Sequence, residues 1–128
     1  MPKEFINPDT LSTPPGYSHV VKAGNLVFIS GQIAVDPNGQ IVGIGDIDAQ
    51  ARQVFANLEA AVKAGGGRKE DIVDITIYLI EREHLAAYRS ARDQFFPCNP
   101  PASTLLFITG LARPEIMLEI EATAVIGD

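Results

Sequence analysis

The sequence predicts an α+β fold, in which a mixed β-sheet carries two helices on one face. Two stretches, residues 46–64 and 82–96, place apolar side chains at helical spacing. Short runs around them alternate in polarity or are rich in β-branched residues, which is typical of strands. At 128 residues and 46% hydrophobic content, we expect one domain spanning 1–128 with a core of its own. The expected order is two or three strands, a helix, a strand, a helix and two strands.

The first third of the chain predicts an arm followed by paired strands. Residues 1–16 contain four prolines and indicate an extended arm or loop. "HVVKAGNLVFIS" predicts two short strands joined by a turn at Ala23-Gly24-Asn25. Gly31 interrupts the second of these strands, which indicates a bulge or a close approach of another chain segment. "DPNGQ" predicts a tight hairpin turn, because Asn-Gly tolerates positive φ angles.

Both predicted helices are amphipathic. Asp46 is suited to cap the helix over 46–64, and Gly65-Gly66-Gly67 ends it. The apolar side of the first helix consists of Ile47, Ala51, Val54, Leu58 and Ala61. The apolar side of the second consists of Leu85, Tyr88, Ala91 and Phe95, and Pro97 follows it.

Three further strands are expected over 71–80, 102–109 and 115–126. Two of them have a purely apolar side, which should carry the helices. These sides are Val73, Ile75, Ile77 and Leu79 in the first, and Leu118, Ile120, Ala122, Ala124 and Ile126 in the last. The opposite sides mix polar and apolar residues. Exposure to water and a subunit interface that encloses polar groups both explain that mixture, and the pattern alone does not decide between them.

Composition excludes several classes of protein. A formal net charge of −6 and the lack of a basic run argue against nucleic-acid binding. No apolar run approaches the ~20 residues that span a bilayer, so no membrane association is expected. Cys98 is the only cysteine, which rules out an intrachain disulfide. Without a secretory signal in the sequence, we expect a cytoplasmic protein.

No metal or cofactor motif is evident. His19 and His84 lie in different predicted elements and, with one cysteine, do not have the spacing of a zinc site. No glycine-rich phosphate loop is present. Cys98 lies in a proline-rich loop with no histidine nearby, which favours a bystander thiol.

One pair of acidic residues attracts attention. Glu119 and Glu121 share one side of an otherwise apolar strand. A solvated sheet face, or arginine partners across an interface, accounts for them without any chemistry. The alternative is a partly buried carboxylate with a raised pKa that activates water.

Several stretches together resemble the Rid (YjgF) family of reactive-intermediate imine and enamine deaminases. They are "GYS" at 16–18, "ISGQIAVDPNGQIVG" at 29–43, "AQARQVFANLEAAVKAGGG" at 49–67 and "LEIEATAV" at 118–125. The resemblance implies a chorismate-mutase-like fold, and a homotrimer whose sheets close into a barrel with a ligand cleft at each interface. It also implies no metal or cofactor. The implied reaction is hydrolysis of 2-imines and 2-enamines to 2-oxo acids and ammonia.

Residue-level matching to the family implies roles for four residues. Tyr17 lines the cleft, Ser30 and Gly31 border it, and Glu119 holds or activates the water. The family's deaminases grip the substrate carboxylate with an arginine after Pro-Ala, where this chain has Ser103. That departure implies an arginine-lacking branch and weak binding of the usual 2-imino acids.

Two further departures lie nearby. Leu105 replaces a frequent cysteine, and Arg89 replaces a cleft asparagine. Under the enzymatic hypothesis, Arg89 is the replacement anchor while Ser103 and Thr104 donate hydrogen bonds. The ordinary alternative for Arg89 is a solvated helix residue. The competing hypothesis for the whole protein is a non-catalytic metabolite binder or interaction module. A nuclease, an occasional label in this family, is disfavoured by the acidic charge.

Overall fold

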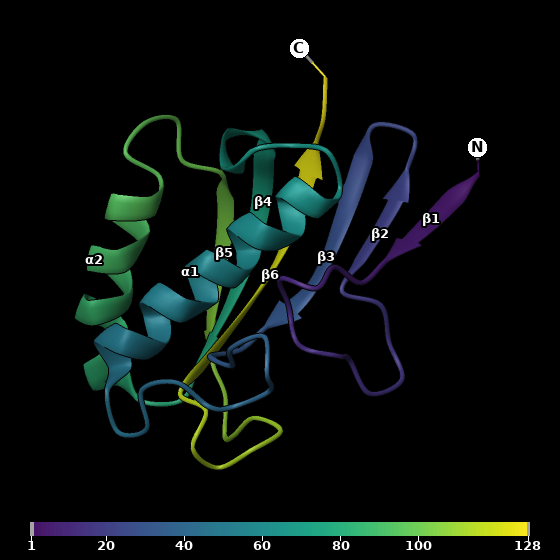
Figure 1. Cartoon of the computed structure of the whole chain (residues 1–128). Coiled ribbons are helices and arrows are strands. Elements are labelled where there is room, and N and C mark those ends of the chain that lie inside the picture. Colours follow the sequence, from purple (N-terminus) through teal and green to yellow (C-terminus); the bar gives the residue numbers. More distant parts are fainter. Residues whose placement is uncertain (1, 128) are drawn as a thin grey trace.

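The computed structural model describes residues 2–127, and in it the strands form one six-stranded sheet (Figure 1). The spatial order is β1-β2-β3-β6-β4-β5. The strands are β1 (Lys3–Ile6), β2 (Val20–Ala23), β3 (Leu26–Gln32), β4 (Ile72–Leu79), β5 (Ala102–Phe107) and β6 (Leu118–Val125). The helices are α1 (Ile47–Ala64) and α2 (Leu85–Phe95). This is the predicted α+β class with a mixed sheet.

The sheet is antiparallel except at one edge. β4 and β5 run parallel, because α2 connects them as a crossover, and every other pair is antiparallel. β6, the last strand, lies in the middle between β3 and β4. The C-terminal strand therefore joins the N-terminal hairpin to the β4–β5 unit, and its side chains occupy the centre of the sheet.

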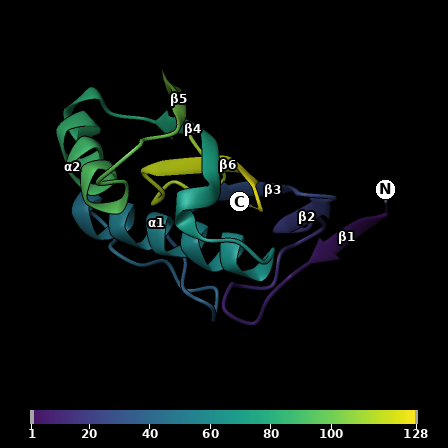
Figure 2. The ribbon, with the colours of Figure 1, turned by 90° about the horizontal axis from the view of Figure 1, so that it is seen from above.

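Both helices cover the same face of the sheet, as the sequence predicts (Figure 2). α1 begins at Asp46, whose carboxylate accepts a bond from the Ala49 N–H at 3.1 Å. Its end carries Gly65, whose N–H bonds to Ala61 O at 3.2 Å. α2 packs against α1 through aromatic side chains, and Phe55 and Phe95 lie 4.9 Å apart between ring centroids.

The core lies between the sheet and these helices. In β6, Leu118, Ile120, Ala122 and Ala124 are buried against the helices, which confirms the predicted apolar side. Glu119 and Glu121 belong to the opposite, open face. On β4, Tyr78 of that face pairs with Glu119.

Four local expectations need correction or refinement. The proline-rich arm contains a strand, β1, because its residues 3–6 pair with β2 despite the nearby prolines. Val73 is 45% exposed, since the register of β4 shifts between Ile72 and Asp74 and Ile72 takes the buried place. α2 starts only at Leu85, after a 3₁₀ turn at Arg82–His84. The "DPNGQ" turn exists, but the residues on its two sides form only a single β-bridge, between Val35 and Ile41, and no extended hairpin.

No helix within residues 2–127 has the length and apolar character needed to cross a bilayer.

Candidate functional site

A β-bulge in β3 sets the geometry of the candidate site. Ile29 pairs with Ala122 and Gln32 pairs with Ile120, so Ser30 and Gly31 together face one residue of β6. Such a bulge breaks the ladder and turns the strand locally. The bulge predicted from Gly31 is therefore present.

Gly31 and Glu119 are packed directly against each other. A Cβ built on Gly31 would overlap Oε2 of Glu119 and lie 2.7 Å from its Cδ. Real Cβ atoms do not approach other atoms so closely, so any side chain at position 31 would displace the carboxylate. Glycine at this position is what allows Glu119 to lie along the backbone of β3.

Glu119 and Glu121 differ in environment although they lie on one face. Glu119 is half-buried, and burial first and the charge of Glu121 second raise its pKa above the usual range. Glu121 is exposed and accepts a 2.8 Å hydrogen bond from the Tyr78 hydroxyl. Glu119 is thus a half-buried carboxylate with a raised pKa, which suits the role of a general acid or base.

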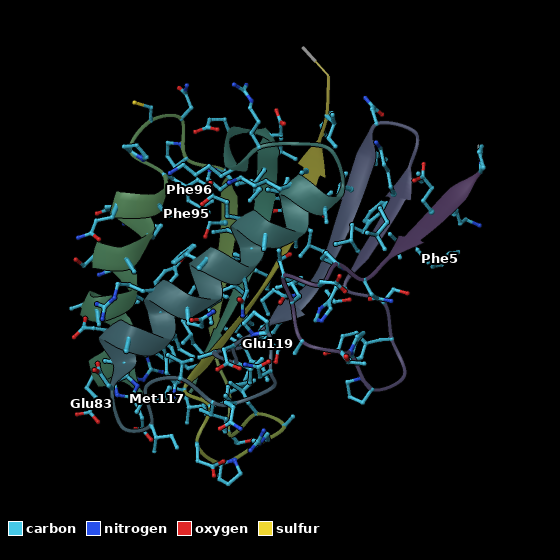
Figure 3. All side chains as sticks on the ribbon, in the orientation of Figure 1. Phe5, Glu83, Phe95, Phe96, Met117 and Glu119 are labelled. Atoms are coloured by element: carbon cyan, nitrogen blue, oxygen red, sulfur yellow. The ribbon has the colours of Figure 1, made fainter. Side chains whose placement is uncertain are left out.

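Glu119 lines a cavity of about 270 Å³ with Tyr78, Ile108, Leu111 and Glu121, and two further, adjoining cavities lie beside this carboxylate. Of these two, the one that Glu119 also lines has a volume of about 320 Å³, and its walls are Tyr17, Ser30, Gly31, Ile33, Ala112 and Glu119. A larger cavity of about 410 Å³ shares four of these walls, Tyr17, Gly31, Ile33 and Ala112. Arg113 lines only the larger one. Glu119 lies near the end of the sheet at which the loops gather (Figure 3).

The loop before β2 is fastened to the bulge by polar contacts. Ser30 donates from Oγ to Ser18 O at 2.6 Å, and its N–H bonds to His19 O at 2.9 Å. His19 is buried, and each of its ring nitrogens has a polar neighbour. Its Nε2 lies 2.7 Å from Ser12 O, and its Nδ1 lies 3.1 Å from Nε2 of Gln32. Since the carbonyl only accepts and the amide nitrogen only donates, this arrangement fits the neutral ring with its proton on Nε2.

Tyr17 closes the cavity from this loop. Its ring meets that of His19 edge-on, with centroids 5.6 Å apart. Burial and the nearby charge of Glu119 raise the pKa of Tyr17, so its hydroxyl remains protonated and able to donate.

Two buried amides on α1 hold the other walls. Gln50 donates to Glu115 O at 2.8 Å and accepts from the Met117 N–H at 2.9 Å. Asn57 donates to Ile33 O at 3.0 Å and Val35 O at 2.9 Å. These contacts tie the loops on both sides of the cavities to one helix.

Sequence reasoning missed both amides, although a signal for them exists. Gln50 and Asn57 lie seven residues apart, within the apolar stripe of Val54 and Leu58. A polar residue at such a position must be buried with hydrogen-bond partners. Arg113 was also missed, because its loop has no periodicity to indicate which way a side chain points.

The predicted site residues fall into two groups. Tyr17, Ser30, Gly31 and Glu119 surround one cavity. Ser103, Thr104 and Leu105 lie on β5, the edge strand, which β6 and β4 separate from β3. Glu119 itself lies on β6, two strand spacings or about 10 Å from β5. None of these three β5 residues lines a cavity that Glu119 lines.

The side-chain directions on β5 increase this separation for Ser103 and Leu105 but not for Thr104. Ser103 pairs with Ile75 and Leu105 with Ile77, so both point to the helix side, where Leu105 packs against the core. Thr104 pairs with Thr76 on the open face. Arg89 is exposed on α2, in the layer that covers the helix side of the sheet.

Tyr88 lies on α2 beside Ser103 of this second group. It is almost fully buried, and burial raises its pKa to about 12 against the opposing effects of Arg92 and the Ser103 hydroxyl. The Ser103 hydroxyl is close enough to affect this pKa, but within the described residues no group meets the distance and angle of a hydrogen bond to the Tyr88 hydroxyl.

The described part of the chain contains no cluster of three or more histidine, cysteine, aspartate or glutamate side chains suited to a metal ion. The chemistry available at the cavity is that of a half-buried carboxylate, a tyrosine and a serine.

The chain matches known proteins over almost its whole length. A family model described as endoribonuclease L-PSP matches residues 9–126. A RutC family protein of Pyrococcus horikoshii is 37% identical over 124 residues, covering 95% of this chain and 97% of the relative. The 3-aminoacrylate deaminase RutC of Acinetobacter baylyi is 32% identical over 127 residues, covering 97% and 98%. The crystal structure of RidA from an Antarctic Psychrobacter species superposes with a TM-score of 0.90 at 30% identity, covering 96% of this chain and 99% of that one.

Proposed function

This chain belongs to the Rid (YjgF) family, and from that premise we propose that it hydrolyses small imines or enamines to a carbonyl compound and ammonia. The relative that is named as a 3-aminoacrylate deaminase supports a deaminase reaction. The observation that carries the proposal is the half-buried Glu119, with its raised pKa, on the wall of a cavity beside Tyr17 and Ser30.

The reaction needs one water and a proton carrier. The reacting imine is protonated on nitrogen, and Glu119 accepts a proton as the water oxygen bonds to the C=N carbon, which gives a neutral carbinolamine. Glu119 returns this proton to the nitrogen, and the C–N bond then breaks so that its electron pair leaves with ammonia. The carbinolamine hydroxyl gives its proton to Glu119 as the C=O bond forms, and this proton is released with ammonia as ammonium. Tyr17 donates a hydrogen bond near the reacting atoms, and Ser30, whose hydroxyl proton is donated to Ser18 O, offers an acceptor oxygen. Such positioning and proton transfer contribute factors of roughly 10²–10⁴.

We propose that the active protein is a homotrimer with each cleft shared by two subunits. Phe28 and Leu106 are 46% and 43% exposed, and both lie on the face of the sheet away from the helices. Apolar side chains on an uncovered face favour association. The two groups of site residues are separated within one chain, and in a trimer a neighbouring chain would bring its β5 edge to each cavity.

A single exposed cysteine, Cys98, agrees with a cytoplasmic location.

A second function, binding without turnover, is favoured by Ser103. No guanidinium stands at the position where the family's deaminases bind the substrate carboxylate. The same residue supports assignment to an arginine-lacking branch. A nuclease activity, as the family model's description suggests, conflicts with the net charge of −6.

The test uses a panel of freshly generated imines, neutral and carboxylated, with ammonia release as the readout. We expect Glu119→Gln to lower kcat/KM by roughly 10²-fold or more, and Glu121→Gln to change it little. Glu121→Gln is the matched control, since it alters the same strand face. Ligand-induced thermal stabilisation without ammonia release would favour the binding function instead. Loss of turnover in Glu121→Gln but not in Glu119→Gln would contradict the assignment.

A further inference from the structure

Arg113 is the one arginine that lines the cavities beside Glu119 in residues 2–127. We propose that Arg113 binds the carboxylate of the substrate and selects substrates whose carboxylate is separated from the reacting carbon by additional carbon atoms. This proposal rests on the proposed function, because that function identifies the reacting group as a C=N carbon. It differs from the expected mode, in which an arginine at position 103 would hold a carboxylate on the reacting carbon itself.

The arrangement of the two cavities carries the first step. Glu119 lines the smaller cavity and not the larger, while Arg113 lines the larger and not the smaller. The cavities meet along Tyr17, Gly31, Ile33 and Ala112. A ligand with its C=N carbon beside Glu119 and its anionic end at Arg113 therefore extends across this junction. A carboxylate attached directly to the reacting carbon would stay in the smaller cavity with Glu119, whose charge repels it.

The charge of Arg113 is available to a ligand. Within residues 2–127 the ion pairs are Lys63 with Glu59 and Arg92 with Asp93, and neither involves Arg113. The protein carries a net charge of −6, so an anionic substrate needs a local cation to enter. A guanidinium binds a carboxylate through two parallel hydrogen bonds, which is the strongest single contact of this kind.

The loop that carries Arg113 is held in place. Arg113 O accepts a bond from the Ile116 N–H at 3.1 Å, which closes a tight turn. The next residues are fixed by the fully buried Gln50, which bonds to Glu115 O and to the Met117 N–H. This anchorage reduces the entropy that the loop would otherwise lose on binding.

The test compares two acids and a neutral ketone as product analogues, titrated into the full-length protein by calorimetry. 2-Oxobutanoate has its carboxylate on the carbonyl carbon, 4-oxopentanoate has it two carbons further, and 2-pentanone has none. We expect wild-type protein to bind 4-oxopentanoate more tightly than 2-oxobutanoate. Arg113→Gln should weaken the binding of 4-oxopentanoate by roughly 10–100-fold and leave the affinity for 2-pentanone unchanged. Arg113→Lys should recover part of the affinity.

Arg52→Gln is the matched control, because it removes the same charge from an exposed position on α1 outside both cavities. Equal loss in Arg52→Gln and Arg113→Gln would mean that only the net charge matters, and would overturn the proposal. Unchanged binding in a folded Arg113→Gln protein, tighter binding of 2-oxobutanoate, or no binding of either acid to wild type would overturn it as well.

A kinetic arm separates this inference from the proposed function. The imines of the same compounds are assayed for ammonia release by wild type and Arg113→Gln. Selective, Arg113-dependent binding of 4-oxopentanoate without any turnover would reject the deaminase function and retain Arg113 as the anion site. Turnover that depends on Glu119 but is insensitive to Arg113 would retain the function and reject the inference.

Discussion

At the scale of the residue, Glu119 holds its charge in an unfavourable place. Burial and Glu121 both penalise the ionised form, so the pKa of Glu119 in the folded protein lies above its unfolded value. A raised carboxyl pKa favours folding below the unfolded pKa, and this contribution is lost as pH rises through the folded pKa. At neutral pH, Glu119 therefore weakens the fold that its chemistry requires.

It follows that Glu119→Gln should raise the thermal midpoint at pH 7 while it removes activity. The amide cannot ionise, so the advantage should disappear at a pH below the ordinary carboxyl value of 4.5. Thermal unfolding of both proteins as a function of pH measures this difference. Glu121→Gln is the control and should show a smaller gain, because it relieves only the charge repulsion with Glu119 and leaves the burial of Glu119, while its amide oxygen still accepts from Tyr78. A Glu119→Gln protein that is less stable than wild type at pH 7 would refute the argument.

Gly31 gives a second prediction at this scale. Gly31→Ala should lower kcat/KM by at least about tenfold, because its methyl group and the carboxylate of Glu119 occupy the same space. Gly110→Ala is the matched control, since a Cβ there meets no atom within 4 Å. Circular dichroism would verify that both variants fold. Full activity in Gly31→Ala would show that Glu119 does not need its present position.

Residue patterns predict this part of the site only partially. The alternation in β6 places Glu119 and Glu121 on one face, and Gly31 in a strand indicates a bulge. The pattern does not distinguish the two carboxylates. Their difference arises from the approach of β3, which is a contact distant in sequence.

At the scale of the element, α1 fixes the loops around the cavities. Its outer side is solvated, but Gln50 and Asn57 on its buried side bond to loop backbone on opposite sides of the cavities. Helix propensity and periodicity predict the helix and its Asp46 cap. They do not predict which loops its amides will hold, because those partners depend on tertiary packing.

Gln50→Ala should therefore destabilise the protein by about 1–3 kcal/mol, since it removes the partly buried hydrogen bonds of Gln50 with the Glu115 carbonyl and the Met117 N–H. Urea unfolding measures the change. Gln94→Ala, on the exposed side of α2, should change the unfolding free energy by less than about 0.5 kcal/mol. Equal stability of the two variants would mean that water replaces the Gln50 contacts at no cost.

The errors in strand assignment also have element-scale causes. Proline argues against a central strand, but β1 lies at the edge of the sheet, where proline neighbours are tolerated. Strict alternation through Val73 predicts a regular β4, whereas the shift after Ile72 inverts the side on which Val73 lies. Bulges add one residue to one strand, and a period of two residues does not reveal them.

At the scale of the whole molecule, the candidate site is divided between two places. The cavity of Glu119 borders β3 and β6, while Ser103 and Arg89 belong to the β5 edge and α2. Sequence matching assigns all of them to one cleft, because it carries no information about which chain supplies each residue. The cleft between two subunits that we propose would reconcile the matching with the distance between the groups.

This arrangement makes Ser103→Arg a test of the assembled protein. Wild type should hydrolyse 2-iminobutyrate poorly, because no guanidinium stands where that carboxylate should bind. Ser103→Arg should raise kcat/KM on this substrate by up to roughly 10–100-fold. The gain is smaller if Leu105 or Arg89 obstructs the new side chain. A wild type as active on 2-iminobutyrate as arginine-containing relatives assayed beside it would contradict the premise.

Mixing subunits then shows which chain supplies the arginine. The double variant Glu119→Gln, Ser103→Arg should be inactive alone, since each of its cavities lacks the carboxylate. Unfolded and refolded together with wild type, it should form mixed trimers in which a wild-type Glu119 faces an arginine from its neighbour. Turnover of 2-iminobutyrate should then exceed that of either parent, because only the mixed interface holds both groups. If each site is built from a single chain, mixing gives no more than the wild-type activity present. A sedimentation mass equal to one chain of 13.7 kDa would exclude the shared site altogether.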